Sequence, residues 1–202
     1  MSERDPALAL FEFSSISAGI VAGDAMVKSA PLGAIYAGTV HPGKYLVLVM
    51  GDTASVDEAV TVGNEAGSES LVDMVFLPDA HPTVAQALSG NTLRAPVGEE
   101  ALGIVETSSV AASLDAADAG VKAADVLLAS IRLADGLGGK GYVLFSGVVA
   151  EVEAALDAAV SRVEPHGTLI RSDLIAQLHG EMADNLRAEL HFLSRVSSAG
   201  GG

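Results

Sequence analysis

The sequence predicts an α/β (α+β) protein made of two tandem copies of one small ferredoxin-like domain, each with the order strand–helix–strand–strand–helix–strand. Three observations predict this fold. Two 24-residue segments, which begin at Ala7 and Ala101, are identical at 12 positions. Apolar residues alternate in short segments and recur at helical spacing in the segments between them. The length of 202 residues suits two domains of roughly 100 residues each.

The internal repeat extends beyond these two segments. The phrase GKYLVLVMG at residues 43–51 matches GKGYVLFSG at residues 139–147, and a weaker match joins residues 71–81 to residues 169–179. The second copy carries two extra residues before its GK phrase. Self-similarity that runs through the whole length of a unit indicates a duplicated structural unit. The two halves of the chain are therefore predicted to share one fold.

The first strand and the first helix are predicted at the start of each copy. Residues 8–13 alternate in the way that is typical of a strand. Ser14 or Ser15 can accept a hydrogen bond from a free amide of the following helix, so either one could be its N-cap. The small and apolar face of this helix continues to Ala30, and Pro31 ends it.

The remaining elements of the first copy follow in a regular order. Strands near residues 32–39 and at residues 45–50 flank a loop that contains proline and glycine. A turn then leads into a second helix over about residues 54–66, and a last strand covers residues 71–77. The second copy repeats this order.

The ends of the two copies set the predicted domains. Residues 89–100 hold proline and glycine without apolar periodicity and are predicted to be the linker. We therefore predict a first domain at residues 1–95 and a second at residues 101–202. An extra amphipathic helix is predicted over residues 181–195, and residues 197–202 read as a tail.

Composition excludes several classes of function. The net charge of −15 argues against a nucleic-acid partner, because such binding depends on Lys and Arg neutralising phosphates. No apolar run reaches the 18 or more residues that a membrane-spanning helix needs, and residues 1–6 are too polar and too few for a signal peptide. The chain has no cysteine, which excludes disulfides, zinc–thiolate sites and cysteine-ligated iron–sulfur clusters.

The apolar content predicts extensive contacts between subunits. Half of the residues are hydrophobic and the mean hydropathy is +0.42. Two small domains have modest cores and cannot bury all of this surface alone. We therefore expect an obligate oligomer.

Several phrases together resemble a known family. They are DAMVKSA at residues 24–30 with its echo DAGVKAA at residues 118–124, GIVETSSVAA at residues 103–112, and the phrases HPGKYLVLVMGD at residues 41–52 and GLGGKGYVLFSG at residues 136–147. In combination they resemble the shell-protein (BMC) domain of bacterial microcompartments. The tandem arrangement is similar to the trimeric, tandem-domain class, and the order of elements to its non-permuted propanediol-utilisation member, which holds an iron–sulfur cluster at its pore.

The resemblance implies a structural protein and not an enzyme. Three copies would form a pseudohexameric homotrimer with a central pore for small metabolites. Such tiles would join other shell proteins around encapsulated enzymes, in the bacterial cytoplasm, without nucleic-acid or membrane partners. A soluble α/β enzyme or ligand-binding protein with a cleft between the two copies is the alternative from another class.

The resemblance also assigns the loops between the two middle strands of each copy to the pore. On the residues alone they are ordinary hairpin loops with turn-forming side chains. Glycines in such loops let backbones crowd an axis and offer amide groups to anions. The predicted pore residues are Thr39, Val40, His41, Pro42 and Gly43 in the first copy, and Asp135, Gly136, Leu137, Gly138 and Gly139 in the second.

Among these residues, His41 leads to the most specific functional hypothesis. It stands where the cluster-bearing relative has its cysteine ligand, so a cysteine-ligated cluster is not expected and no cofactor is expected. Three His41 side chains around one axis could instead bind a metal ion, form a metal or redox relay, or give the pore a pH-dependent positive charge. A solvated histidine at the rim of the pore without a ligand is the plainest alternative.

Three repeated charged positions remain. The resemblance assigns Lys28 and Lys122 to the edge where tiles meet, whereas the sequence alone favours solvated cations at helix ends. The arginine that often completes this edge in the family is missing from both copies. The pairs Glu12/Glu106 and Asp24/Asp118 are predicted to be structural, for example by binding a neighbouring backbone, since no histidine recurs beside them.

Overall fold

The computed structural model describes residues 7–88, 101–134 and 136–187 and has the predicted order of elements in both halves. The first half contains β1 (Ala7–Phe13), α1 (Ile16–Ser29), β2 (Ala34–Val40), β3 (Lys44–Gly51), α2 (Thr53–Gly67), the 3-10 turn η1 (Ser68–Ser70), β4 (Leu71–Leu77) and then α3 (Pro82–Leu88). The second contains β5 (Ala101–Thr107), α4 (Val110–Ala123), β6 (Leu127–Leu133), β7 (Gly141–Gly147), α5 (Val149–Val163), η2 (Glu164–His166), β8 (Leu169–Ile175) and then α6 (Gly180–Arg187).

Each half forms one four-stranded antiparallel sheet. The strand orders are β2-β3-β1-β4 and β6-β7-β5-β8, so the ferredoxin-like prediction is confirmed in both copies. The pairing of β1 with β4 shifts register after Glu12, and the pairing of β5 with β8 shifts after Glu106. The duplication therefore preserves even the local irregularity of the sheet.

The two extra residues of the second copy lie in one turn. Val40 faces Lys44 across the first hairpin, and Ala134 bonds to Lys140 in the second. Three residues separate the first pair and five separate the second. The second hairpin therefore has the longer, glycine-rich turn that the sequence predicts.

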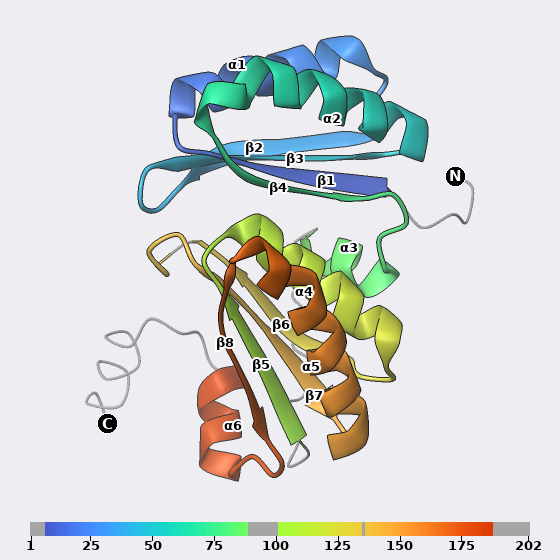
Figure 1. Cartoon of the computed structure of the whole chain (residues 1–202), viewed down its shortest axis with the longest axis vertical. Helices are drawn as coiled ribbons and strands as arrows, with labels where there is room; N and C mark the ends of the chain where they lie inside the picture. The colour runs from blue at the N-terminus through green and yellow to red at the C-terminus, as the bar shows by residue number, and fades with distance from the viewer. Residues whose placement is uncertain (1–6, 89–100, 135, 188–202) are drawn as a thin grey trace, which may run out of the picture.

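The two domains are packed together in layers. Helices α1 and α2 cover one face of the first sheet, and the opposite face of that sheet rests on α4 of the second domain (Figure 1). One apolar cluster accordingly joins Leu8, Leu10 and Leu77 of the first domain to Val110 and Leu114 of the second. A separate cluster under α1 and α2 contains the rings of Phe11 and Phe13.

Helix caps form where the sequence predicts them. Ser15 accepts a hydrogen bond from the Ala18 amide at 3.3 Å, and Ser109 accepts one from the Ala112 amide at 3.2 Å. Asp52 caps α2 through the Ser55 amide at 3.0 Å. Val148 holds the equivalent position before α5 and provides no side-chain cap.

The two short helices that follow the last strands β4 and β8 differ from the prediction. The sequence pattern does not predict α3, and α6 begins at Gly180, with the predicted residues 188–195 outside the described part of the chain. Both helices begin after a histidine: His81 Nδ1 accepts from the Thr83 amide and His179 Nδ1 accepts from the Glu181 amide, each at 3.3 Å. The predicted linker and tail also lie outside the described residues, so the exact domain limits stay a prediction.

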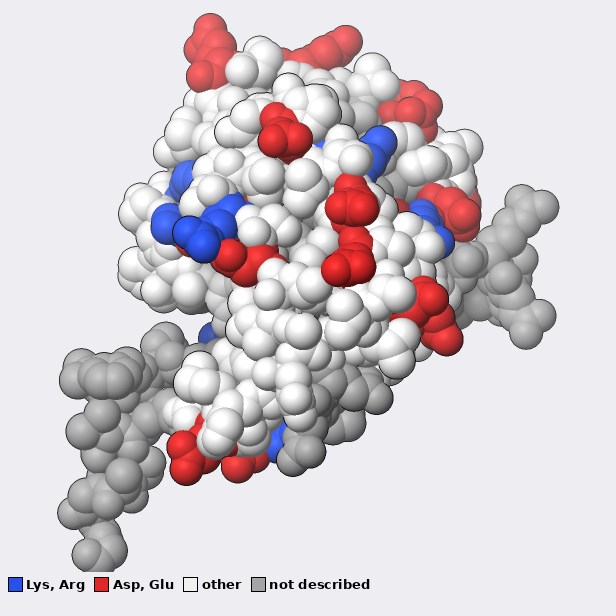
Figure 2. Space-filling model, turned by 60° about the horizontal axis from the view of Figure 1, so that its bottom comes forward, with Lys and Arg blue, Asp and Glu red and all other residues white. Residues whose placement is uncertain are grey.

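Two surface properties bear on function. Acidic side chains are spread over the face shown in Figure 2, with uncharged areas between them and basic side chains beside acidic ones. Among the described residues, no helix is both long enough and apolar enough to cross a membrane.

Candidate functional site

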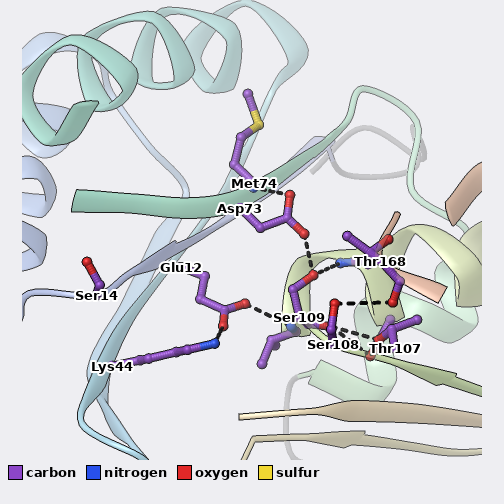
Figure 3. Close-up of polar contacts among 12 residues, drawn as sticks. Glu12, Ser14, Lys44, Asp73, Met74, Thr107, Ser108, Ser109 and Thr168 are labelled. Carbon is purple, nitrogen blue, oxygen red and sulfur yellow. Dashed lines mark hydrogen bonds and ion pairs between the residues drawn. The ribbon is translucent and has the colours of Figure 1, made fainter. Parts of the chain in front are cut away.

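A buried carboxylate joins the two domains. The side chain of Glu12, on β1, is fully buried; one of its oxygens pairs with Lys44 and the other accepts a hydrogen bond from the Val110 amide at 2.8 Å (Figure 3). Val110 is the first residue of α4. A carboxylate at the positive end of a helix is stabilised by its free amides and its dipole. The predicted structural role of Glu12, in binding a neighbouring backbone, is confirmed.

A second polar contact lies beside the first. Ser109 caps α4 and also donates from Oγ to the carboxylate of Asp73 on β4 (Figure 3). The hydroxyl of Thr107 in turn donates to the Ser109 carbonyl at 2.8 Å. The start of α4 is thus fixed to the first sheet by two carboxylates.

The far end of α4 is held by the chain that leaves the first sheet. One oxygen of Asp118 accepts from the His81 amide at 2.7 Å, and the other accepts from Lys122 Nζ at 2.6 Å. Lys122 also donates to the carbonyl of Asp79. Asp118 therefore has a structural role as well, and Lys122 lies at the contact between the domains.

The equivalent polar residues of the other copy are not covered by another domain in the described part of the chain. Glu106 keeps its ion pair with Lys140 at 2.8 Å, but its side chain is 34% exposed whereas that of Glu12 is 0% exposed. Asp24 and Lys28 pair with each other at 2.5 Å, and both side chains are mostly exposed.

The apolar faces of α1 and α4 show the same contrast. Leu114 on α4 is 0% exposed, and Ile20, at the equivalent place on α1, is 53% exposed. Ile16 and Val27 are likewise exposed, although their counterparts on α4 are buried. The difference arises because α4 packs against the first sheet, whereas among the described elements no strand of the second domain packs against α1. The exposed face of α1 is an apolar patch of the kind that marks a binding surface.

The second sheet carries a different residue at one point of this contact. Glu12 faces Asp73 across the first sheet, and Glu106 faces Arg171 across the second. Arg171 pairs with Asp173, and this guanidinium lowers the pKa of the Asp173 carboxyl below its ordinary value. The two sheets therefore present related but not identical surfaces.

The two predicted pore loops lie next to each other. Thr39 and Val40 end β2, while the three residues that follow form its turn to β3. In the second hairpin, residues 136–139 form the described part of the turn, and Asp135 lies outside the described residues. A Cβ added to Gly139 would lie 3.0 Å from Cδ of Pro42, so the two turns are in close contact.

The backbone of these turns requires glycine at several points. Gly43 has a φ of +90°, and Gly136, Gly138 and Gly139 also have positive φ values. L-residues with side chains rarely adopt this region, which explains why glycines recur in both turns.

His41 is the first residue of the turn between β2 and β3. Within the described ranges, no group of three histidine or acidic side chains in one chain could hold a metal ion. The described part of one chain therefore does not supply a complete set of metal ligands around His41.

A cavity between the domains bears on the alternative of an enzyme. It is lined by residues of both copies, among them Asp73, Asp115, Arg162 and His166, and its volume is about 80 Å³. Arg162 and Asp115 are bound to each other at 3.0 Å. Sites for small molecules usually measure about 300–1,000 Å³, so this cavity is too small for a substrate site.

Three comparisons with known proteins agree with this architecture. The family model of the BMC domain matches residues 7–80 and again residues 101–178. The bacterial microcompartment shell protein PduT of Citrobacter freundii is 39% identical over 176 residues, which cover 87% of this chain and 95% of PduT. The shell protein EutM of Salmonella typhimurium is 35% identical over 85 residues, which cover 42% of this chain and 86% of EutM.

A solved structure extends the similarity to three dimensions. The crystal structure of a microcompartment protein from Desulfitobacterium hafniense superposes with a TM-score of 0.77 at 38% identity, and the match covers 89% of this chain and 99% of that one. The sequence repeat, the paired sheets and these matches lead to one conclusion. The chain belongs to the BMC-domain family and carries two copies of the domain in tandem.

Proposed function

We propose that this chain is a structural shell protein of a bacterial microcompartment, and that three copies close into a tile with a central pore. The first part follows from membership of the family, since the similar proteins are shell proteins by name and the match spans almost their whole length. The chain is accordingly not an enzyme. The trimer and the pore are argued from the contact between the two domains.

One observation carries the trimer. Each chain contains one complete contact between a sheet and the first helix of another domain. It also presents the two surfaces that would form a second contact of this kind, but they do not meet each other within one chain. One surface is α1 with its exposed apolar face. The other is the second sheet with the exposed Glu106–Lys140 pair. The counterparts of these two surfaces, α4 and the first sheet, cover each other within the chain. This indicates that α1 of one chain would be covered by the second sheet of another.

The two open surfaces are complementary to each other and not to themselves. Association through such surfaces runs head to tail, and it produces a closed ring when the rotation between copies closes. Three chains bring six copies of the domain around one axis, as in the trimeric class that the sequence resembles. A ring would also bury the apolar excess of the composition.

The neighbouring hairpin turns support a pore on this axis. Because Gly139 approaches Pro42 within one chain, a ring would bring six such turns together, alternating between the short and the long form. Small metabolites would pass between these turns. His41, Gly136, Leu137 and Gly138 are the residues that we propose to line the passage.

The outer rim of the tile would meet other shell proteins. Lys28 and Lys122 stand in the last turns of α1 and α4 and are our candidates for this edge. Lys122 already binds the Asp79 carbonyl across the domain contact, so only part of its donor capacity is left for a neighbouring tile.

The mass of the particle in solution tests the proposal. Size-exclusion chromatography with light scattering should give about 61 kDa, three times the 20.4 kDa of one chain. The mass should hold on dilution into the low micromolar range, since obligate oligomers bury large apolar surfaces. A particle of 20.4 kDa under all conditions would overturn the proposal.

A further inference from the structure

The short helices α3 and α6 occupy equivalent places in the two copies. Each follows the last strand of its sheet, and each is capped at its start by Nδ1 of a histidine, His81 or His179. Counted from these caps, Val84 on α3 corresponds to Met182 on α6. The surface that α3 contacts therefore indicates which equivalent surface α6 would contact.

Helix α3 lies between the two domains. It packs against α4 and β6 of the second domain, and Val84 is buried in the same apolar cluster as Ala117 and Val121 of α4. The hydrogen bond from the His81 amide to Asp118 fixes its start to α4. Helix α3 thus connects its own sheet to the next domain.

Helix α6 packs on its own sheet, but among the described residues it does not contact another domain. Ala183 and Leu186 pack on the second sheet against Leu102 and Leu144. Met182 points away from this cluster and is 52% exposed, whereas Val84 is 0% exposed. One face of α6 is therefore bound to its own sheet, and the other faces solvent.

A groove on the first domain matches the surface that α3 covers on the second. It runs between α1 and β2, measures about 250 Å³, and is lined by Gly19, Gly23, Val27, Ile35 and Ala37. Gly19, Gly23 and Val27 of α1 are the counterparts of Ser113, Ala117 and Val121 of α4. The groove is thus the equivalent of the surface that α3 covers, and none of the described residues of the chain covers it.

The sizes of the side chains are matched across the two copies. Where the second domain has Ala117, the groove has Gly23, and a Cβ added there would have its nearest neighbour 3.6 Å away, whereas the space beside Gly19 is already taken by Tyr45. Where α3 has Val84, α6 has the longer Met182. A flexible methionine fills an irregular apolar groove well. The larger side chain on α6 and the smaller one in the groove, at Gly23, are complementary changes if the two surfaces meet.

We infer that α6 of one subunit docks into the α1/β2 groove of the next subunit, with Met182 as its central side chain. This inference rests on the proposed trimer and names the contact that closes it. By equivalence with α3, the His179 amide donates to Asp24 of the next subunit, and Lys28 of that subunit donates to the Gln177 carbonyl. The polar contacts frame an apolar centre, as in a typical binding interface.

Substitution of Met182 tests the inference. Met182→Asp places a charge in the groove and should raise the protein concentration at which half of the trimer dissociates by at least about 100-fold, while Met182→Ala should raise it about tenfold. Ile170→Asp is the matched control, because Ile170 and its counterpart Val72 are both exposed, so this position is not covered at either contact. The control should leave the dissociation unchanged, and circular dichroism verifies the fold of each variant.

A compensating pair separates docking from a general effect on the fold. Gly23→Ala has room within its own domain, since the new Cβ would lie 3.6 Å from Val47, yet it makes the groove shallower. Alone it should weaken the trimer about tenfold, and Met182→Val in the same chain should restore it, because this pair reproduces the Ala117–Val84 combination.

The outcomes are distinct for the two claims. A wild-type chain that is monomeric overturns the proposed trimer. A wild-type trimer whose dissociation is unaltered by Met182→Asp, or a Gly23→Ala variant that Met182→Val does not rescue, overturns the docking of α6 and leaves the trimer standing.

Discussion

Glu12 and Glu106 show how one residue acquires two roles through duplication. Both glutamates bind a lysine at the start of the neighbouring strand: Lys44 is the first residue of β3, and Lys140 directly precedes β7. Only Glu12 also receives a helix N-terminus within the chain, the Val110 amide of α4. The contact of Glu12 therefore stabilises the folded chain, whereas in the proposed ring the equivalent contact of Glu106 stabilises the trimer.

Substituting each glutamate by alanine should separate folding from assembly. Glu12→Ala leaves Lys44 and the Val110 amide without their buried partner and should lower the free energy of unfolding by about 3 kcal/mol. Glu106→Ala should change the unfolding of the dilute monomer by less than about 0.5 kcal/mol, because the site is exposed there. It should weaken the trimer instead. Denaturant unfolding and dilution experiments measure the two effects, and equal losses in monomer unfolding would contradict the distinction.

His41 leads to a prediction about metal content. One chain supplies a single His41 to the proposed axis, and no cysteine is present to hold a cluster. We expect the purified trimer to carry less than one metal ion per ring, with the same content in His41→Ala. Elemental analysis by mass spectrometry decides the matter. One bound ion per ring that disappears in the variant would assign a metal site to His41.

Some residue roles were within reach of the sequence and others were not. The caps Ser15 and Ser109 follow from a serine before an apolar helix. The partners of Glu12 do not, because Lys44 lies 32 positions away and Val110 lies 98 positions away. The one available signal was that Lys44 recurs as Lys140 in the repeated GK phrase. Strand register brings Lys44 to Glu12, and the packing of α4 against the first sheet brings the Val110 amide; the sequence leaves both open.

At the scale of elements, the start of the second helix differs between copies. Asp52 caps α2, and its hydrogen bonds from Ser55 lower the pKa of its carboxyl below the ordinary value of 3.8. Val148 at the equivalent place leaves α5 without a side-chain cap. The repeat thus contains its own comparison of a capped and an uncapped helix.

Exchanging these caps should move stability in opposite directions. Asp52→Ala should lower the temperature of thermal unfolding, and Val148→Asp should raise it, because a carboxylate at the N-cap accepts from the free amides of the first turn. Since the folded pKa of Asp52 is depressed, its contribution is present above pH 3.8 and is lost as the pH falls through the folded pKa. Thermal unfolding at pH 7 and at pH 2.5 measures this. An Asp52→Ala effect that is equal at both pH values would contradict the role of the charged cap.

The elements themselves were mostly predictable. The predicted strands and helices of the first copy agree with the structure to within two residues, because the apolar alternation and the caps define them. Helix α3 was missed because its seven residues are too few for a helical period to be visible. Its cap is the ring of His81, a residue type that does not usually signal a helix start.

At the scale of the whole molecule, the apolar excess and the exposed face of α1 have one explanation. The sequence indicates that surface must be buried elsewhere but does not indicate which surface. The structure identifies it, because the exposed apolar residues Ile16, Ile20 and Val27 of α1 have buried counterparts on α4. Duplication allows this identification within a single chain, and it also allows the two pore turns to differ in length.

Disulfide cross-linking tests the central claim, that the contact within the chain recurs between chains. The chain has no cysteine, so introduced pairs are the only thiols. Ser109→Cys with Asp73→Cys joins two side chains that are in contact within one chain. Ser15→Cys with Arg171→Cys occupies the equivalent positions, which no contact within one chain brings together in the described structure.

The two cysteine pairs should behave differently on a non-reducing gel. The first should oxidise without any change in mass, and the second should link chains into covalent dimers and closed trimers of about 61 kDa, three times 20.4 kDa. Oxidation of the first pair with only 20.4 kDa chains from the second would contradict the account.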